Sequence, residues 1–302
     1  MHQLDIFLDS HEVTLANEAI AALSALDSER AARAIDCLRA AAPERSDLPC
    51  LDKLHDFLSL FQSADFAALD PDAVEVVVEV FSDRVVPCAR VLGDAGKGFL
   101  TFFWLRLARA ASAPFDPERP QLHAAELFLR AEAYEAAEEA ASGVVGQPTH
   151  RAVLRWQAIT RYRRAGRRAA LSKIFVLAWH APDAFADLLA ELDDRQLAKE
   201  WVAFEADVED LDASWFPVWH LLHQPASAAA VDVDLADALA QQAEGAATES
   251  IPALHAYRLL ARILDLEKGG HSAKLVALRA RLQAIDAGFF TAYMRSRDVR
   301  YR

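Results

Sequence analysis

The chain has few cysteines, and their arrangement is unlike that of a metal site. Three occur in 302 residues, at Cys37, Cys50 and Cys88, and no CxxC pair is present. An odd number of widely spaced cysteines argues against a disulfide framework and against a zinc cluster. We therefore expect a reduced compartment, no bound metal, and each cysteine packed as a small buried apolar residue.

Glycine, methionine and long apolar runs are also scarce. The chain has 10 glycines and 2 methionines, whereas alanine and leucine, the strongest helix formers, are abundant. The most apolar stretch, residues 99–107, is far shorter than the roughly 20 residues of a membrane span and contains Arg106. The first nine residues lack a basic leader, and Asp5 and Asp9 interrupt any apolar core. These features predict a helical, cytoplasmic protein without a membrane segment or a membrane partner.

Positive charge is in deficit over the chain as a whole. The sequence has 32 Lys and Arg against 45 Asp and Glu, which gives a formal net charge of −13. This charge favours solubility and opposes uniform attraction to nucleic acid or anionic lipid, although it leaves room for a local basic patch. With 53% hydrophobic and 25% charged residues, the composition is that of a globular chain rather than a disordered one.

Nothing in the sequence reads convincingly as a strand. Residues 74–81, VEVVVEVF, have the β-branched content of a strand. However, Asp70-Pro71 is typical of a helix start, and Val74, Val77, Val78 and Phe81 fall on one helical face. We therefore predict a helix there.

Two further helix boundaries and one irregular segment are predicted. Asp116-Pro117 indicates a helix start before 119–131, and Gly166 separates predicted helices at 150–164 and 167–180. Residues 224–233, QPASAAAVDV, have little amphipathic pattern and are predicted to be irregular or mobile.

Prolines recur at a regular spacing. Pro114, Pro148 and Pro182 are each 34 residues apart, and Pro217 and Pro252 follow at steps of 35. Shifting 117–148 by 34 residues aligns apolar positions throughout: Leu122 with Trp156, Ala125 with Ile159, Phe128 with Tyr162, Ala141 with Phe175, and Val144 with Ala178. A period of 34 is the length of two helices with their turns, which is the signature of a helix-pair repeat.

The segment 119–182 resembles two tetratricopeptide-type repeats. The residues that carry the resemblance are Trp156, Gly166, Ala170, Phe175, Ala178 and Pro182 in one copy, and Leu122, Tyr134, Ala137, Ala141 and Pro148 in the copy before it. The chain departs from the family pattern in three ways. Glu132 replaces the turn glycine, Phe103 and Leu171 replace the close-packing alanine, and the spacing from Trp156 to Gly166 is one residue short.

The resemblance implies an all-α fold in which antiparallel helix pairs stack into a curved right-handed superhelix, a tetratricopeptide-like solenoid. We expect about fifteen to nineteen helices. One domain would span 1–302, with an irregular helical part at 1–113 and the regular repeats at 114–302. The resemblance also implies a non-enzymatic scaffold, without cofactor or catalytic residues, that binds a peptide or protein along its concave face.

The sharpest local feature is a basic cluster at 151–173. It carries eight positive side chains and no acid: Arg151, Arg155, Arg161, Arg163, Arg164, Arg167, Arg168 and Lys173. We predict that the partner, a protein or an acidic peptide, contacts His123, Arg130, Gln157, Arg161 and Arg164. Arg130 and Arg164 are 34 residues apart and would form a ladder along the groove.

Three alternatives stay open. The cluster is neutralised internally if its arginines pair with the acids of the flanking helices, which are Glu126, Glu132, Glu135, Glu138, Glu139, Glu191, Asp193 and Asp194. The protein is instead a nucleic-acid- or phosphate-binding protein if the cluster binds phosphates. A third alternative is an enzyme whose site has no recognisable motif.

Three other motifs are interpreted as structural. The arginines at 295, 297, 300 and 302 are predicted to form a solvated tail. The glycine-rich segment 93–98 lacks the residues of a phosphate loop and is predicted to be a turn between helices. His220 and His223 share a helical face, but only Asp212 is an acid at plausible spacing nearby, so packed or surface histidines are favoured over a metal site.

Overall fold

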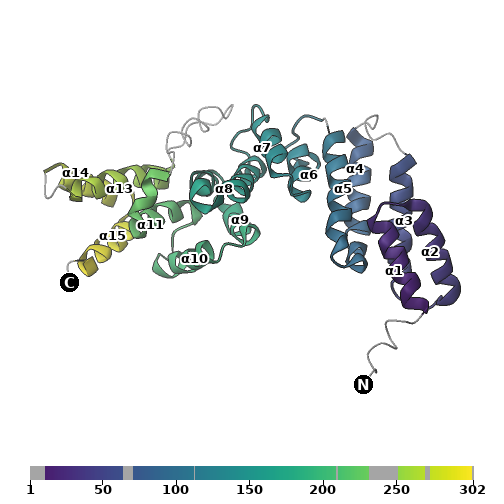
Figure 1. Cartoon of the computed structure of the whole chain (residues 1–302). Helices are drawn as coiled ribbons and strands as arrows, with labels where there is room; N and C mark the ends of the chain where they lie inside the picture. The colour runs from purple at the N-terminus through teal and green to yellow at the C-terminus, as the bar shows by residue number, and fades with distance from the viewer. Residues whose placement is uncertain are drawn as a thin grey trace, which may run out of the picture. The chain divides into compact units, whose positions relative to one another are not determined.

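The computed structural model describes residues 11–63, 71–111, 113–208, 210–230, 251–268 and 273–300 (Figure 1). Within these residues the chain forms fourteen α-helices, joined by short 3-10 segments and loops, and no strand occurs among them. The all-α prediction is therefore confirmed. The internal contacts divide the chain into two compact units, Met1–Ala137 and Glu138–Arg302. The single domain and its boundary near residue 113 stay predictions.

Unit 1 is built around a cluster of phenylalanine rings. Its helices are α1 His11–Ser24, α2 Ser28–Ala41, α3 Leu48–Ser63, α4 Pro71–Val80, α5 Ala95–Ala110 and α6 Ala124–Arg130, and α7 Tyr134–Ser142 spans the boundary between the units. Phe57 and Phe61 of α3 meet Phe103 of α5 with ring centroids 5.1 and 4.7 Å apart. Phe81, which follows α4, stacks on Phe57 at 4.9 Å. Aromatic burial of this kind holds α3, α4 and α5 together.

Unit 2 begins with a long helix that is broken in the middle. Its elements are α8 Arg151–His180, α9 Phe185–Leu192, α10 Arg195–Asp207, α11 Phe216–His223, α13 Pro252–Lys268, α14 Ala273–Ile285 and α15 Ala287–Arg300. At Gly166 the backbone of α8 leaves the helical region, so α8 is two helices with a turn between them, as predicted. The core includes the fully buried rings of Trp156, Phe175, Phe204 and Phe216.

The helix predicted at 74–81 is confirmed, because α4 runs over Pro71–Val80 and continues as a π-helical turn over Phe81–Val85. Asp70, its predicted cap, lies outside the described residues. In the predicted irregular segment 224–233, Pro225–Ala230 form a 3-10 helix, and 231–233 lie outside the described residues.

The helix start predicted at Asp116-Pro117 is wrong. Asp116 Oδ1 instead accepts a hydrogen bond from the Glu118 backbone N–H at 2.9 Å, a 3-10 turn follows at Pro120–Leu122, and α6 begins at Ala124. A residue before proline is driven out of the helical region, and Arg119 before Pro120 has φ −131°. The true cap is His123, whose Nδ1 accepts from the Ala125 N–H at 3.2 Å.

The turns of the two predicted repeats fall at equivalent positions. Glu132 has φ 57° between α6 and α7, and Gly166 has φ 77° and ψ 174° between the two halves of α8. These residues are 34 apart, so Glu132 adopts a left-handed φ at the position where the family has glycine. A Cβ at Gly166 would meet no atom within 4 Å, so only the backbone conformation requires glycine there.

Opposite substitutions at Glu132 and Gly166 test whether the backbone conformation of each turn favours glycine. We expect Glu132→Gly to raise the free energy of unfolding by about 0.5–1 kcal/mol, since glycine adopts positive φ without strain. Gly166→Ala should lower it by about 1–3 kcal/mol, because its φ and ψ are essentially restricted to glycine. Urea unfolding followed by circular dichroism measures both changes. Destabilisation by Glu132→Gly would show that the exposed ion pair of Glu132 with Lys97 at 2.8 Å outweighs the backbone strain.

The cysteines differ in exposure. Cys88 is buried, Cys50 is half-buried and Cys37 is exposed, so the prediction that all three are buried is wrong for Cys37. The buried face of α2 is formed by Ala31, Ala34, Ile35 and Leu38, and Cys37 lies off that helical stripe. The helical spacing of apolar residues in this segment would by itself have predicted that Cys37 is exposed.

Burial and the adjacent Cys50 thiol raise the pKa of Cys88 to about 11. Since the thiolate is the reactive form, we expect iodoacetamide at pH 8 to alkylate Cys37 in the folded protein and to leave Cys88 unmodified until denaturant is added. Peptide mass spectrometry over a time course measures this. Equal rates at Cys37 and Cys88 in the folded protein would contradict the assignment.

Candidate functional site

The predicted site residues in unit 1 have local partners. His123 caps α6, its ring lies 5.7 Å from Phe115, and burial lowers the pKa of its imidazole. Arg130 forms an ion pair with Glu126 at 3.2 Å, donates to Ser82 Oγ at 3.2 Å and lies 4.9 Å from the centroid of the Trp104 ring. Both side chains therefore hold α6 in place, and a role in partner binding stays a prediction.

The predicted site residues in unit 2 divide into bonded and exposed ones. Gln157 Oε1 accepts a hydrogen bond from Lys173 Nζ at 3.0 Å, and Arg164 pairs with Glu138. Arg161 is exposed and forms no ion pair or hydrogen bond with any residue that the structure describes. Because Arg130 and Arg164 belong to different units, the ladder between them stays a prediction.

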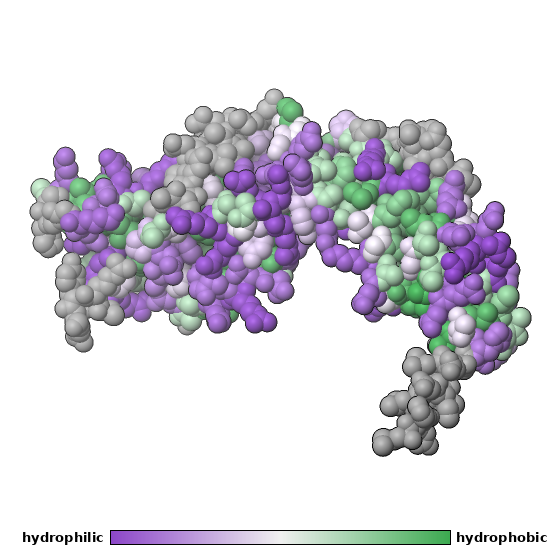
Figure 2. Space-filling model, viewed as in Figure 1, coloured by the Kyte–Doolittle hydropathy of each residue, from purple (hydrophilic) through white to green (hydrophobic). Residues whose placement is uncertain are grey.

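Neutralisation of the basic cluster is partial. Arg155 makes a bidentate pair with Glu191 at 2.6 and 2.7 Å, Arg151 lies 3.8 Å from Asp183, and Arg163 donates to the Glu191 carbonyl oxygen at 2.9 Å. Three arginines around the Gly166 turn, however, are exposed and have no ion pair within the described part of the chain. These are Arg161, Arg167 and Arg168. Figure 2 shows that hydrophilic side chains dominate the visible face of unit 2 around α8 to α10.

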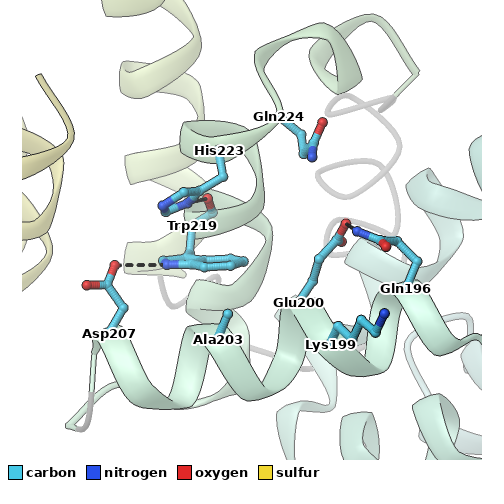
Figure 3. A pocket seen from close by; sticks show the side chains of 8 residues that line it. All are labelled: Gln196, Lys199, Glu200, Ala203, Asp207, Trp219, His223 and Gln224. Atoms are coloured by element: carbon cyan, nitrogen blue, oxygen red, sulfur yellow. Dashed lines mark hydrogen bonds between the residues drawn. The ribbon is translucent and has the colours of Figure 1, made fainter. Parts of the chain in front are cut away.

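A cleft of about 500 Å³ lies between α10 and α11 in the same unit (Figure 3). Helix α10 lines it with Gln196, Lys199, Glu200, Ala203 and Asp207, and α11 and the residue after it add Trp219, His223 and Gln224. Along α10 these residues recur every three or four positions, with Lys199 and Glu200 adjacent, as expected for one broad helical face. Asp194 Oδ1 caps this helix by accepting from the N–H groups of Gln196 and Leu197 at 2.8 and 3.1 Å.

The wall of the cleft on α11 is an indole and an imidazole in contact. The rings of Trp219 and His223 are 4.2 Å apart, and the Trp219 Nε1–H donates to Asp207 Oδ2 at 3.0 Å (Figure 3). His223 Nδ1 lies 2.9 Å from the Trp219 carbonyl oxygen. Because a carbonyl only accepts, Nδ1 donates this hydrogen bond. His223 is exposed, and its Nε2 makes no hydrogen bond within the described part of the chain, so the cleft offers this nitrogen to a ligand.

Behind this wall lies a buried histidine–carboxylate pair. His220 is 5% exposed, its ring lies 5.2 Å from that of Phe175, and its Nδ1 lies 3.0 Å from Glu200 Oε2. Burial raises the pKa of Glu200, but the hydrogen bonds from His220 and Gln196 outweigh it, so its pKa lies below the usual value. Arg167 adds to this lowering, which places this one exposed arginine within electrostatic reach of the cleft.

The two acids of the cleft therefore already have partners. Glu200 is bound by His220 and Gln196, and Asp207 is bound by Trp219 and lies 3.3 Å from Arg295. Lys199 and Gln224 are exposed, and within the described part of the chain their side chains make no hydrogen bond or ion pair. The unpaired groups of the cleft are thus an ammonium, an amide and an imidazole nitrogen. None of the eight lining residues carries a hydroxyl or a thiol.

The histidine interpretation agrees with these contacts, since His220 is packed and the His223 ring lies tilted against that of Trp219. Asp212, the acid considered as a third ligand, caps the next turn by accepting from the Ser214 N–H at 2.9 Å. No group of three or more His, Cys, Asp or Glu side chains suited to a metal ion occurs among the described residues. The sequence analysis did not identify this face of α10 as part of a site. The pattern that could have indicated it is the helical spacing of the polar residues at 196, 199, 200 and 207, followed along the chain by Trp219 and His223.

The solvated tail predicted at the C-terminus is wrong for Arg297. Its side chain is buried and lies 3.2 Å from Glu267 Oε2. Helix α15 continues past this residue, so Phe289, Tyr293 and Arg297 share one inward face at spacings of four. Arg295 is exposed, and the side chains of Arg300 and Arg302 lie outside the described residues.

Removing Glu200 tests its pairing with His220. We expect Glu200→Ala to lower the free energy of unfolding by about 1–3 kcal/mol at pH 7, because the buried Nδ1–H of His220 loses its acceptor. The lowered pKa of Glu200 means that its stabilisation is present above the unfolded-state pKa of about 4.3 and is lost as pH falls through the folded-state value. The difference from the unchanged protein should therefore shrink below about pH 4.

Urea unfolding at pH 7 and below about pH 4 measures the loss of stability that Glu200→Ala causes. The control is Glu205→Ala, which removes an exposed carboxylate from the same helix and should change stability by less than about 0.5 kcal/mol. Equal effects of Glu200→Ala at both pH values would contradict the assignment.

No family model matches the chain, and neither the curated proteins nor the solved structures contain a significant match to it. Among the residues that the structure describes, no helix has the length and apolar character needed to cross a membrane.

Proposed function

We propose that this protein is a non-enzymatic interaction scaffold whose α10–α11 cleft binds an extended, acidic segment of a protein partner. The proposal includes the finer architecture, in which helix pairs of tetratricopeptide type stack into a curved right-handed superhelix. The observation that carries it is the set of unpaired groups in the cleft, Lys199, Gln224 and His223 Nε2, beside the Trp219 wall.

These groups match the chemistry of a peptide. An amide side chain both donates to and accepts from a peptide backbone, and an exposed ammonium pairs with a carboxylate. The exposed arginines at 161, 167 and 168 extend the positive potential beyond Lys199, which favours an acidic partner over a basic one. A cleft whose own acids are already bonded does not repel that partner as free carboxylates would.

The two other function classes have weaker support. A buried His220–Glu200 pair resembles the acid–base pairs of enzymes, but His220 is not among the residues that line the cleft. The exposed arginines are suited to phosphates as well as to carboxylates. Of the eight residues that line the cleft only Lys199 is a lysine or arginine, whereas a nucleic-acid strand carries a charge at every phosphate and is bound by several cations.

Site-specific crosslinking tests the proposal. A benzophenone amino acid replaces Ala203, which lines the cleft, and in a control it replaces Ala206, which is exposed on the same helix outside the cleft. In extract of the source cells we expect a defined protein adduct from position 203, linked through an acidic segment of the partner. Lys199→Glu should reduce its yield about tenfold, whereas Arg195→Glu, the same charge change on α10 at a residue that does not line the cleft, should not. Equal adducts from positions 203 and 206, or an adduct with nucleic acid, would contradict it.

A further inference from the structure

A second cleft, of about 500 Å³, lies between α13 and α14. Helix α13 contributes Arg262, Asp265 and Leu266, and α14 contributes Lys274, Ala277, Leu278 and Arg281. None of these residues belongs to the α10–α11 cleft or to the basic cluster at 151–173. Three of the four charged residues that line it are cations.

The surrounding segment has the opposite charge from the rest of the protein. Residues 251–302 hold ten Lys or Arg against four Asp or Glu, a net charge of +6, in a chain whose net charge is −13. The basic character of the cleft is therefore a local concentration of charge, and the preceding 250 residues are strongly acidic. Such a segment attracts anions locally although the whole protein repels them.

The acids of this segment whose side chains the structure describes form no ion pair with the cations of the cleft. Asp265 lies 3.5 Å from Lys268, and both side chains are mostly exposed. Glu267 is already shared by two guanidinium groups, because it lies 2.9 Å from Arg279 and 3.2 Å from Arg297. Asp286 instead caps α15 by accepting from the Phe289 N–H at 2.6 Å.

Positive charge is therefore in excess even inside the bundle. Two buried or half-buried guanidinium groups share the single carboxylate of Glu267, and Nε and one terminal nitrogen of Arg297 are buried without a hydrogen-bond partner. In the cleft itself, Arg262, Lys274 and Arg281 are exposed. They form no ion pair or hydrogen bond with any residue in the described ranges.

The uncharged residues that line the cleft indicate whether it fits a nucleic acid or an acidic protein segment. It consists of Leu266, Ala277 and Leu278, so an aliphatic floor lies between cations from both helices. Single-stranded nucleic acids bind by stacking bases on aromatic rings, and this lining contains none. Guanidinium groups pair with carboxylates through two parallel hydrogen bonds, and an aliphatic floor accepts leucine or valine side chains.

We propose that the α13–α14 cleft is a docking site for an acidic protein segment that also carries aliphatic side chains. Its carboxylates pair with Arg262, Lys274 and Arg281, and its apolar side chains cover Leu266 and Leu278. This site is separate from the α10–α11 cleft, and it binds its segment whether or not the function proposed for that cleft is correct.

Fluorescence anisotropy of the full chain with labelled peptides tests the proposal. The probe is a short peptide of alternating Glu and Leu, and the comparison probes are the same peptide with Ser for Leu, the same peptide with Lys for Glu, and a single-stranded oligonucleotide. We expect the Glu–Leu peptide to bind tightest. Arg262→Glu/Arg281→Glu should weaken its binding by at least about tenfold, as expected when paired charges are reversed.

Two controls separate this site from general charge effects and from the other cleft. Arg84→Glu/Arg109→Glu makes the same change in net charge with two exposed arginines of unit 1 and should leave the affinity within about twofold. The weakening by Arg262→Glu/Arg281→Glu should also persist in a Lys199→Glu background, in which the α10–α11 cleft is itself weakened. Circular dichroism establishes that each variant is folded.

Three results would overturn the proposal. Equal weakening by the two double variants would show that only net charge matters. Tighter binding of the oligonucleotide would make the surface a nucleic-acid site, and equal binding of the Glu–Leu and Glu–Ser peptides would show that the aliphatic floor is not used.

Discussion

The ring of Phe175 joins three helices of unit 2. It lies on the second half of α8 and contacts Phe216 and His220 of α11 at 6.2 and 5.2 Å, and Tyr257 of α13 at 6.4 Å. Aromatic rings that meet edge to face gain energy beyond the area they bury, and they fix the angle between their helices. Because α11 forms part of one cleft and α13 part of the other, this buried ring contributes to the position of both proposed binding surfaces.

Competition for carboxylates decides which cations remain available. In the basic cluster the carboxylate of Glu191 binds Arg155, whereas Arg161, Arg167 and Arg168 around the turn of α8 form no ion pair in the described ranges. In the last three helices Glu267 binds Arg279 and Arg297, which leaves Arg262, Lys274 and Arg281 without one. Exposed ion pairs contribute little stability, so the importance of this pattern lies in the potential that the unpaired cations present to a partner.

The apolar period was sufficient to predict most of the helices but not the exact helix ends. It placed Val74, Val77, Val78 and Phe81 on one helical face, of which Val77 is half-buried and the other three are buried. The cap-and-proline signal at Asp116-Pro117 failed, because Pro120 follows soon after and stops the helix from starting there. The interpretation of the C-terminal arginines as a solvated tail failed at Arg297. The charge is buried beside Glu267, thirty residues earlier in the chain, and no local pattern reports a pairing of that kind.

The sequence by itself determined that the chain is helical, that helix pairs turn near Glu132 and Gly166, and that basic residues concentrate at 151–173. These properties depend on neighbours within a few residues, because helix propensity, capping and the 3.6-residue period are local. Only the tertiary structure decided which arginines are neutralised, that Lys199 and Trp219 face one cleft, and that Arg262 and Arg281 face another. Those outcomes depend on which helix faces which, and packing of buried side chains that are far apart in the sequence fixes that choice.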